Sequence, residues 1–184
     1  KERIRFFCER HAPGFLQQAD AEARIRALHA AKTRHYVELC AKGIPLRPGV
    51  ERLLREARAT GLRLAIATTT TPENVTALLP AELMALFEKV GAGDTAPNKK
   101  PAPDIYQWVL AQLGLPASAC LAIEDSANGL KASAAAGLAT VITLTGYTRD
   151  HDFSGALAVL PDLGRVTVPM LRQWHETAYD VDKK

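Results

Sequence analysis

Two adjacent carboxylates, Glu124 and Asp125, end the short apolar run at residues 121–123. The run is typical of a buried strand, and the chain then turns into a helix. Both carboxylates can therefore reach the sheet edge where α/β folds bind ligands. Two anions this close together favour a bound cation. The structural alternative is that Asp125 or Ser126 is the N-cap of the following helix.

Two further polar groups lie at the ends of predicted strands. Thr68 follows the apolar run 62–67 and begins a row of four threonines, and Lys100 lies in the loop 93–101. Because the carboxyl ends of parallel strands share one edge, we expect these groups to meet the carboxylate pair there. A hydroxyl group with nearby backbone amides, a lysine and a cation on carboxylates together form a phosphate site. Hard oxygen ligands favour Mg²⁺.

Each of these groups also has a plain structural explanation. Thr68 alone fits a hydroxyl group at the entry to the next helix, and Lys100 alone fits a solvated loop lysine. Their order on three successive strand ends favours the phosphate site over both explanations.

The elements that position these groups follow from the hydrophobic pattern. Residues 1–42 carry helical spacing only, which predicts two or three amphipathic helices. From residue 50 onward helices alternate with strands, which predicts an α/β fold with a doubly wound parallel sheet. We expect a helical unit at 1–44, a core at 45–160 and a tail at 161–184 whose pattern is weak. The predicted strands are 62–67, 89–92, 121–123 and 140–144.

Composition argues against several classes of function. The chain has 184 residues, and 47% of them are hydrophobic, which is enough for a buried core. Its net charge of +3 comes from scattered charges of both signs, which argues against a nucleic-acid partner. No apolar run reaches the roughly 18 to 20 residues that span a bilayer. Three widely separated cysteines indicate reduced thiols, so we expect a cytoplasmic protein without a membrane partner.

Three segments, LRLAIATTTTPEN, KKPAPDIY and AIEDSANGL, resemble successive motifs of the haloacid dehalogenase (HAD) superfamily. They are closest to its CbbY-like branch, which is similar to β-phosphoglucomutases and phosphoglycolate phosphatases. The resemblance implies a Rossmannoid core with a helical cap. It also implies that Thr68 binds the transferring phosphoryl group and that Lys100 steadies this group and the nucleophile. Glu124 and Asp125 would hold Mg²⁺.

The resemblance implies substrate contacts as well. Thr69 and Asn74 belong to the threonine loop, and Asn74 looks like a substrate contact, although it fits an ordinary early-helix residue equally well. Residues 1–44 resemble the C-terminal part of a mobile cap that closes over an active site and excludes water. Lys1 and Lys32 fall where such a cap presents cations to a second phosphate or an acidic sugar. Each also fits a plain surface lysine.

One family motif is missing. The family nucleophile is an aspartate in an Asp-x-Asp-Gly-Thr motif that ends the first strand, and these 184 residues contain no such motif. The missing strand would lie between the strands that end at Thr68 and Glu124, so its absence exposes two strand edges. We expect a longer protein, monomeric when complete, whose first segment supplies this strand and the first half of the cap. The 184 residues alone should be inactive.

The expected function is that of a Mg²⁺-dependent phosphatase which acts on a phosphorylated sugar through an aspartyl-phosphate. The CbbY-like match points to xylulose-1,5-bisphosphate, an inhibitor of carbon fixation. A sugar phosphomutase of the β-phosphoglucomutase kind shares every motif quoted, and a non-catalytic phosphate-binding protein also fits. A response-regulator receiver carries similar groups, but its acidic pair comes first in the chain rather than last.

Overall fold

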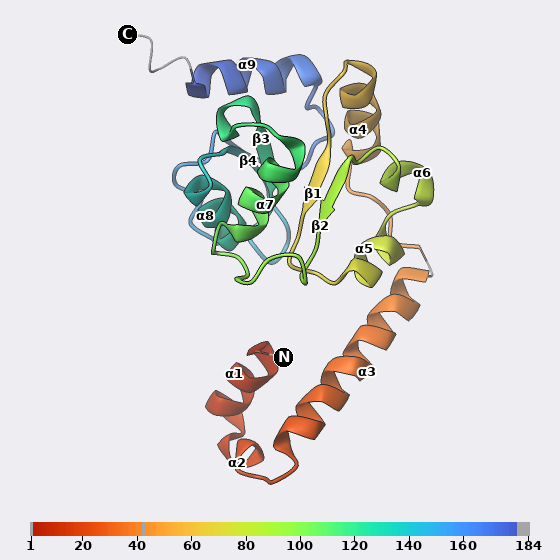
Figure 1. Cartoon of the computed structure of the whole chain (residues 1–184), viewed down its shortest axis with the longest axis vertical. Helices are drawn as coiled ribbons and strands as arrows, with labels where there is room; N and C mark the ends of the chain where they lie inside the picture. The colour runs from red at the N-terminus through yellow and green to blue at the C-terminus, as the bar shows by residue number, and fades with distance from the viewer. Residues whose placement is uncertain (1, 42, 180–184) are drawn as a thin grey trace. The chain divides into compact units, whose positions relative to one another are not determined.

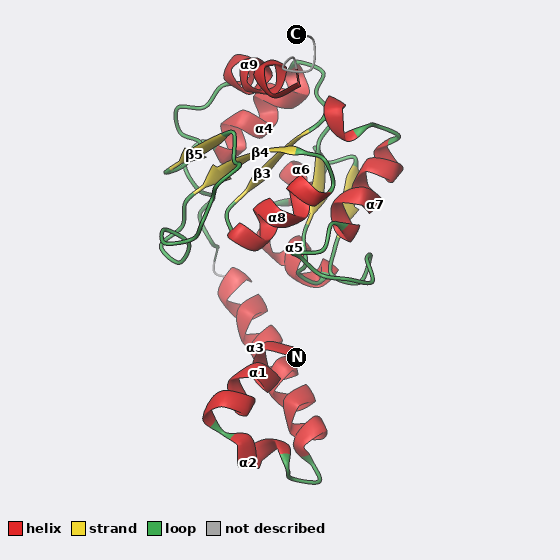
Figure 2. Ribbon diagram, turned by 90° about the vertical axis from the view of Figure 1, so that its left-hand side faces the viewer, coloured by secondary structure: helices red, strands yellow, loops and turns green. Residues whose placement is uncertain are grey.

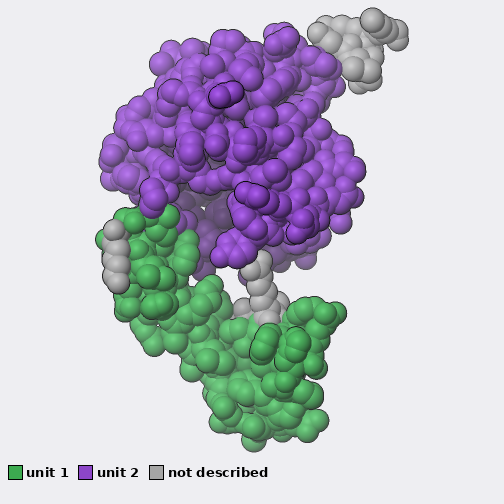
Figure 3. All heavy atoms as spheres, turned by 180° about the vertical axis from the view of Figure 1, so that it is seen from behind, with its two compact units in different colours: residues 1–44 green, residues 45–184 purple. Residues whose placement is uncertain are grey.

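A computed structural model describes residues 2–41 and 43–179, in two compact units that divide between Ile44 and Pro45 (Figure 3). The first unit is helical, as predicted, with α1 (Glu2–His11), α2 (Pro13–Leu16) and α3 (Ala21–Ala41). Ile25 is fully buried in it, and the Arg5 guanidinium pairs with Glu22 at 2.5 Å. Across the described residues, no helix is both long and apolar enough to cross a bilayer.

The second unit alternates helices and strands (Figure 1). Its elements are α4 (Val50–Ala59), β1 (Ala65–Ala67), α5 (Pro72–Leu78), α6 (Ala81–Met84), β2 (Lys89–Gly91), α7 (Asp104–Leu113), the 3₁₀ turn η1 (Ala117–Ala119), β3 (Leu121–Glu124), α8 (Ala127–Ala135), β4 (Ala139–Thr143), β5 (Ala158–Leu160) and α9 (Val168–Tyr179). All four predicted strands form, and the first is shorter than predicted. The hydrophobic pattern did not indicate α6, β5 or α9.

The residues after 160 belong to the core of the second unit. Leu163, Val166 and Val168 are buried, and they pack against Leu53 and Ala57 of α4. The weak pattern of this segment reflects contacts that are distant in sequence. Leu171 and Trp174 of α9 pack against the same cluster.

Every strand pairing is parallel, and helices cover both faces, which confirms the predicted α/β class (Figure 2). The register sets Ala65 opposite Lys89 and Leu121 opposite Ala139. One apolar cluster joins α4 and α9, and a second joins α7, α8 and β3. Leu64, directly before β1, packs in the first cluster and Ala67 in the second, as expected for residues three positions apart in extended chain.

The strands form two separate sheets, β1–β2 and β3–β4–β5, and a cavity of about 890 Å³ lies between them. Successive residues 61–67 and 119–123 line this cavity. Since side chains alternate between the faces of a strand, an unbroken run along one wall means that the strand edge faces the cavity. In the described part of the chain, these edges of β1 and β3 pair with no other strand.

The open edge changes the predicted burial of the central strands. We expected a buried strand at 121–123, but Ile123 is 41% exposed. That prediction was wrong for Ile123, because β3 is an edge strand. The buried strand is β4, which pairs on both sides and whose Val141 and Ile142 are 0% exposed.

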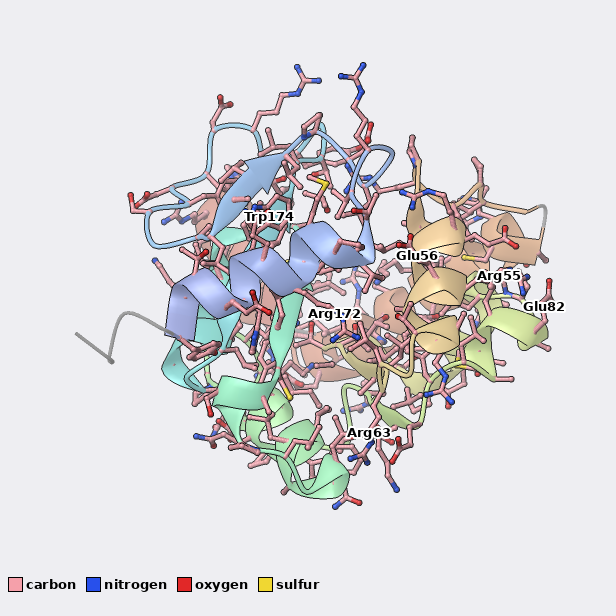
Figure 4. All side chains as sticks on the ribbon, turned by 90° about the horizontal axis from the view of Figure 1, so that it is seen from above. Arg55, Glu56, Arg63, Glu82, Arg172 and Trp174 are labelled. Carbon is pink, nitrogen blue, oxygen red and sulfur yellow. The ribbon has the colours of Figure 1, made fainter. Side chains whose placement is uncertain are left out.

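Charged side chains line the cavity near the amino ends of the strands. Arg172, His175 and Glu176 come from α9, and Arg63 precedes β1; Figure 4 labels Arg63 and Arg172. The His175 Nε2 atom is buried and has no hydrogen-bond partner among the described residues. The cavity is therefore apolar along the strands and polar at this end.

Candidate active site at the strand ends

Lys100 connects the two sheets at their carboxyl ends. Its Nζ atom donates a hydrogen bond to the backbone oxygen of Ala67, the last residue of β1, at 2.9 Å, and forms an ion pair with Glu124 of β3. It also donates to the hydroxyl group of Tyr106 on α7 at 3.3 Å. The side chains of Lys100 and Glu124 are only 13% and 9% exposed. Lys100 is therefore not a solvated loop lysine, and that explanation was wrong.

The carboxylate of Glu124 is surrounded by donors. Its Oε1 atom accepts hydrogen bonds from Lys100 and from the Tyr106 hydroxyl group, and its Oε2 atom accepts one from the backbone N–H of Asp125 at 3.2 Å. A Cβ atom at Gly129 would lie 1.9 Å from Oε2. A glycine at this position is what allows α8 to pass so close to the carboxylate.

The following helix has its own cap. The Ser126 side chain accepts a hydrogen bond from the Gly129 backbone N–H at 3.1 Å, so Ser126 is the N-cap of α8. The structural alternative for the acidic strand end was that Asp125 or Ser126 caps this helix, and the cap is Ser126. Asp125 is therefore not needed as a cap.

Two acidic groups at the strand ends, Asp125 and Tyr106, have raised pKa values. Burial raises the pKa of Asp125, the charge of Glu124 raises it further, and the charges of Lys100 and Arg47 oppose the rise. Burial and the neighbouring Glu124 also raise the pKa of Tyr106, so its hydroxyl group stays protonated and can donate. Asp125 is thus a carboxylate whose charge the surrounding protein compensates poorly, and a bound cation would compensate it.

The threonine loop follows β1 directly. The Thr68 backbone N–H donates to the Gly91 oxygen at 2.9 Å, and the Thr68 hydroxyl group accepts from the Thr70 N–H at 3.2 Å. The N-cap of α5 is Thr71, so Thr68 is not the residue that begins this helix. Thr69 is exposed. Thr68 and Thr69 therefore lie at the same strand end as the backbone oxygen that holds the lysine.

Asn74 is buried behind this loop with only 6% of its surface exposed. Its Nδ2 atom donates to the Thr70 hydroxyl group at 3.2 Å, and its Oδ1 atom has no hydrogen-bond partner among the described residues. A buried acceptor without a partner is uncommon in folded proteins. The assignment of Asn74 as a substrate contact stays a prediction.

The sequence also predicts Lys1 and Lys32 as substrate contacts. Lys32 is an exposed residue of α3 in the first unit. Lys1 lies outside the described residues. Their assignment to substrate binding stays a prediction.

Sequence reasoning missed two residues at the strand ends. Tyr106 stands six positions after Lys100, inside the segment KKPAPDIY, so the motif itself could have pointed to it. Arg47 donates to the Thr143 hydroxyl group and to the Pro161 oxygen, each at 2.9 Å. It binds together the chain segments that follow β4 and β5. No sequence signal distinguishes Arg47 from the other arginines.

The donor set fits Mg²⁺. Glu124 and Asp125 offer hard carboxylate oxygens side by side, and Mg²⁺ is commonly held by one or two carboxylates together with waters and substrate phosphate. In the described ranges, no three His, Cys, Asp or Glu side chains form a metal cluster. Glu124 and Asp125 are therefore the two carboxylates that this part of the site would offer to a cation.

Known proteins resemble this chain closely. The family model for haloacid dehalogenase-like hydrolases matches residues 1–137. Protein CbbY of Cupriavidus necator is 50% identical over 175 residues, which cover 92% of this chain and 69% of that protein. Phosphoglycolate phosphatase of Salmonella typhimurium is 32% identical over 140 residues, 76% of this chain and 54% of that protein.

A solved structure shows the same fold. It is the crystal structure of a CbbY mutant from Rhodobacter sphaeroides in complex with xylulose-(1,5)bisphosphate. Its TM-score is 0.75 at 41% identity, and the match covers 80% of this chain and 68% of that one. The chain thus spans about two thirds of the length of both CbbY proteins.

Proposed function

This chain belongs to the haloacid dehalogenase-like hydrolases, and we propose that it acts in a Mg²⁺-dependent phosphatase whose substrate is a phosphorylated sugar. The observation that carries the proposal is the position of Lys100, which connects the ends of β1 and β3 beside two carboxylates. Xylulose-1,5-bisphosphate is the substrate we favour, since a CbbY structure at 41% identity contains it.

Each residue at the strand ends has a role in this proposal. Lys100 and the Thr68 hydroxyl group bind the phosphoryl oxygens and stabilise charge that develops during transfer. Glu124 and Asp125 hold the cation, and bound Mg²⁺ would neutralise phosphoryl charge. Thr69, Asn74, Lys1 and Lys32 are proposed as substrate contacts.

The nucleophile is proposed to lie outside these 184 residues, on a strand that fills the cavity between β1 and β3. Three observations support this. Both facing edges lack a strand partner in the described chain, the walls along them are apolar, and Lys100 lies at the carboxyl end of both strands. An aspartate ending that strand would attack phosphorus, and the sugar oxygen would leave with a proton from a second acid. Water would then hydrolyse the aspartyl-phosphate.

Product analysis tests the reaction. We expect the protein encoded by the complete reading frame, given xylulose-1,5-bisphosphate and Mg²⁺, to release inorganic phosphate, and we expect EDTA to stop the release. Formation of an isomeric sugar phosphate without inorganic phosphate would instead identify a phosphomutase. Binding without any product would identify a phosphate-binding protein.

Filling the cavity should stabilise the protein strongly. A strand that buries three side chains of the size of Val or Leu contributes about 1.5–3 kcal/mol for each. We therefore expect the protein of the complete reading frame to exceed the 184-residue chain by at least about 4 kcal/mol in free energy of unfolding, measured with urea.

Hydrogen exchange provides the control for this prediction. Amides of β1 and β3 should gain more protection than those of β4, which already pairs on both sides. Equal stability of the two proteins, or equal gains in all three strands, would contradict a strand in the cavity.

A further inference from the structure

The Tyr106 hydroxyl group lies between the two charged partners of the buried ion pair. It donates to Glu124 Oε1 and accepts from Lys100 Nζ, which also lies 4.7 Å from the centroid of the tyrosine ring. The ring is fixed, because Tyr106 is 7% exposed and packs in a cluster with Ile105 and Ala122. A rigid side chain thus contacts both members of the pair.

The acceptors around the Lys100 ammonium group are the Ala67 oxygen, the Tyr106 hydroxyl group and Glu124 Oε1. Because the Tyr106 hydroxyl group also donates to Oε1, these two oxygens lie close together, in nearly the same direction from Nζ, and they share one N–H of Lys100. The Tyr106 contact is the weaker of the two, since it is the longer at 3.3 Å and its acceptor is neutral.

We propose that Tyr106 is a positioning residue of the strand-end site. Its hydroxyl group holds Glu124 by donating to Oε1, and its oxygen is a second, neutral acceptor for the N–H that Lys100 directs at Glu124. Without the hydroxyl group, Glu124 loses a donor and this N–H is directed at Glu124 alone, so the ammonium and the carboxylate shift relative to the phosphate and cation that they would bind. This inference rests on the proposed function, because it assigns a role in that same site.

The test is Tyr106→Phe in the protein of the complete reading frame, which keeps the buried ring and removes only the hydroxyl group. Loss of a group that orients a catalytic residue or ligand typically lowers activity or metal affinity by about 10- to 100-fold. We expect a fall of that size in kcat for xylulose-1,5-bisphosphate and a rise in the Mg²⁺ concentration that gives half-maximal rate. The KM for the sugar should change less than kcat.

Tyr179→Phe is the matched control. The Tyr179 hydroxyl group accepts from the Ala139 N–H at 2.9 Å and bonds to the Gly137 oxygen at 3.0 Å, next to the amino end of β4. Its loss should lower stability and leave kcat and the Mg²⁺ requirement unchanged. Wild-type kinetics in Tyr106→Phe, or equal kinetic losses in both variants, would overturn the inference.

A second readout does not depend on turnover. The ¹⁵N–¹H signal of the Lys100 ammonium group should shift when inorganic phosphate and Mg²⁺ are added to the wild type, and it should already be shifted in Tyr106→Phe before any addition. An inactive wild type with this behaviour counts against the proposed phosphatase only. An unchanged signal in Tyr106→Phe counts against the role of Tyr106.

Discussion

Asp125→Asn in the protein of the complete reading frame should lower Mg²⁺-dependent phosphate release by at least about 10³-fold. The substitution keeps the shape of the side chain and removes the negative charge that we assign to cation binding. The free energy of unfolding, in contrast, should not fall. A carboxyl group whose folded pKa is raised destabilises the folded state once pH exceeds that pKa. At pH 7 the neutral asparagine should therefore be at least as stable as aspartate.

Kinetics and urea unfolding at pH 7 measure both parts of this prediction. Asp150→Asn is the control, because Asp150 is exposed and loses the same charge. Near-normal turnover in Asp125→Asn would refute the metal assignment. A variant that loses activity and stability together would indicate a structural role for Asp125.

Lys100→Met should lower both the stability of the protein and its activity. The substitution keeps an apolar stem of similar length but leaves the Glu124 carboxylate, 9% exposed, without its cation. Removing one partner of a buried ion pair lowers stability by about 3–5 kcal/mol. We expect a loss of that size in the free energy of unfolding, together with at least a 100-fold fall in kcat, on the order expected for a transition-state contact.

A double variant separates the two losses. Lys100→Met with Glu124→Gln removes both charges, so most of the lost stability should return while activity stays low. Lys99→Met is the matched control, since Lys99 is the exposed neighbour and loses the same charge. If Lys99→Met were as damaging as Lys100→Met, or if the double variant were no more stable than the single one, the buried pair would not be the cause.

Much of the fold could be predicted from the sequence because its signals are local. Hydrophobic spacing, with Gly and Pro at helix ends, indicated two or three N-terminal helices and four strands in their correct order. The elements that escaped prediction include α6, β5 and α9. The last of these is stabilised by its packing with α4, which is distant in sequence.

The candidate site was predicted in part by the same means. The types of Thr68, Lys100, Glu124 and Asp125, with the rule that parallel strands share a carboxyl edge, were enough to expect them at one edge of the sheet, and the contact between Lys100 and Glu124 agrees with this. Local sequence could not decide between a solvated and a buried lysine, or between Asp125 and Ser126 as the helix cap. Those outcomes depend on contacts between residues far apart in the chain.

The sequence by itself thus determined which strands end in polar groups and what chemistry those groups share. Only the tertiary structure decided that Lys100 contacts Glu124 and Tyr106, that Ser126 caps α8, and that β1 and β3 face one cavity. The physical reason is that burial and ion pairing arise where separate elements pack. A pKa or an open strand edge is a property of that packing and not of any one segment.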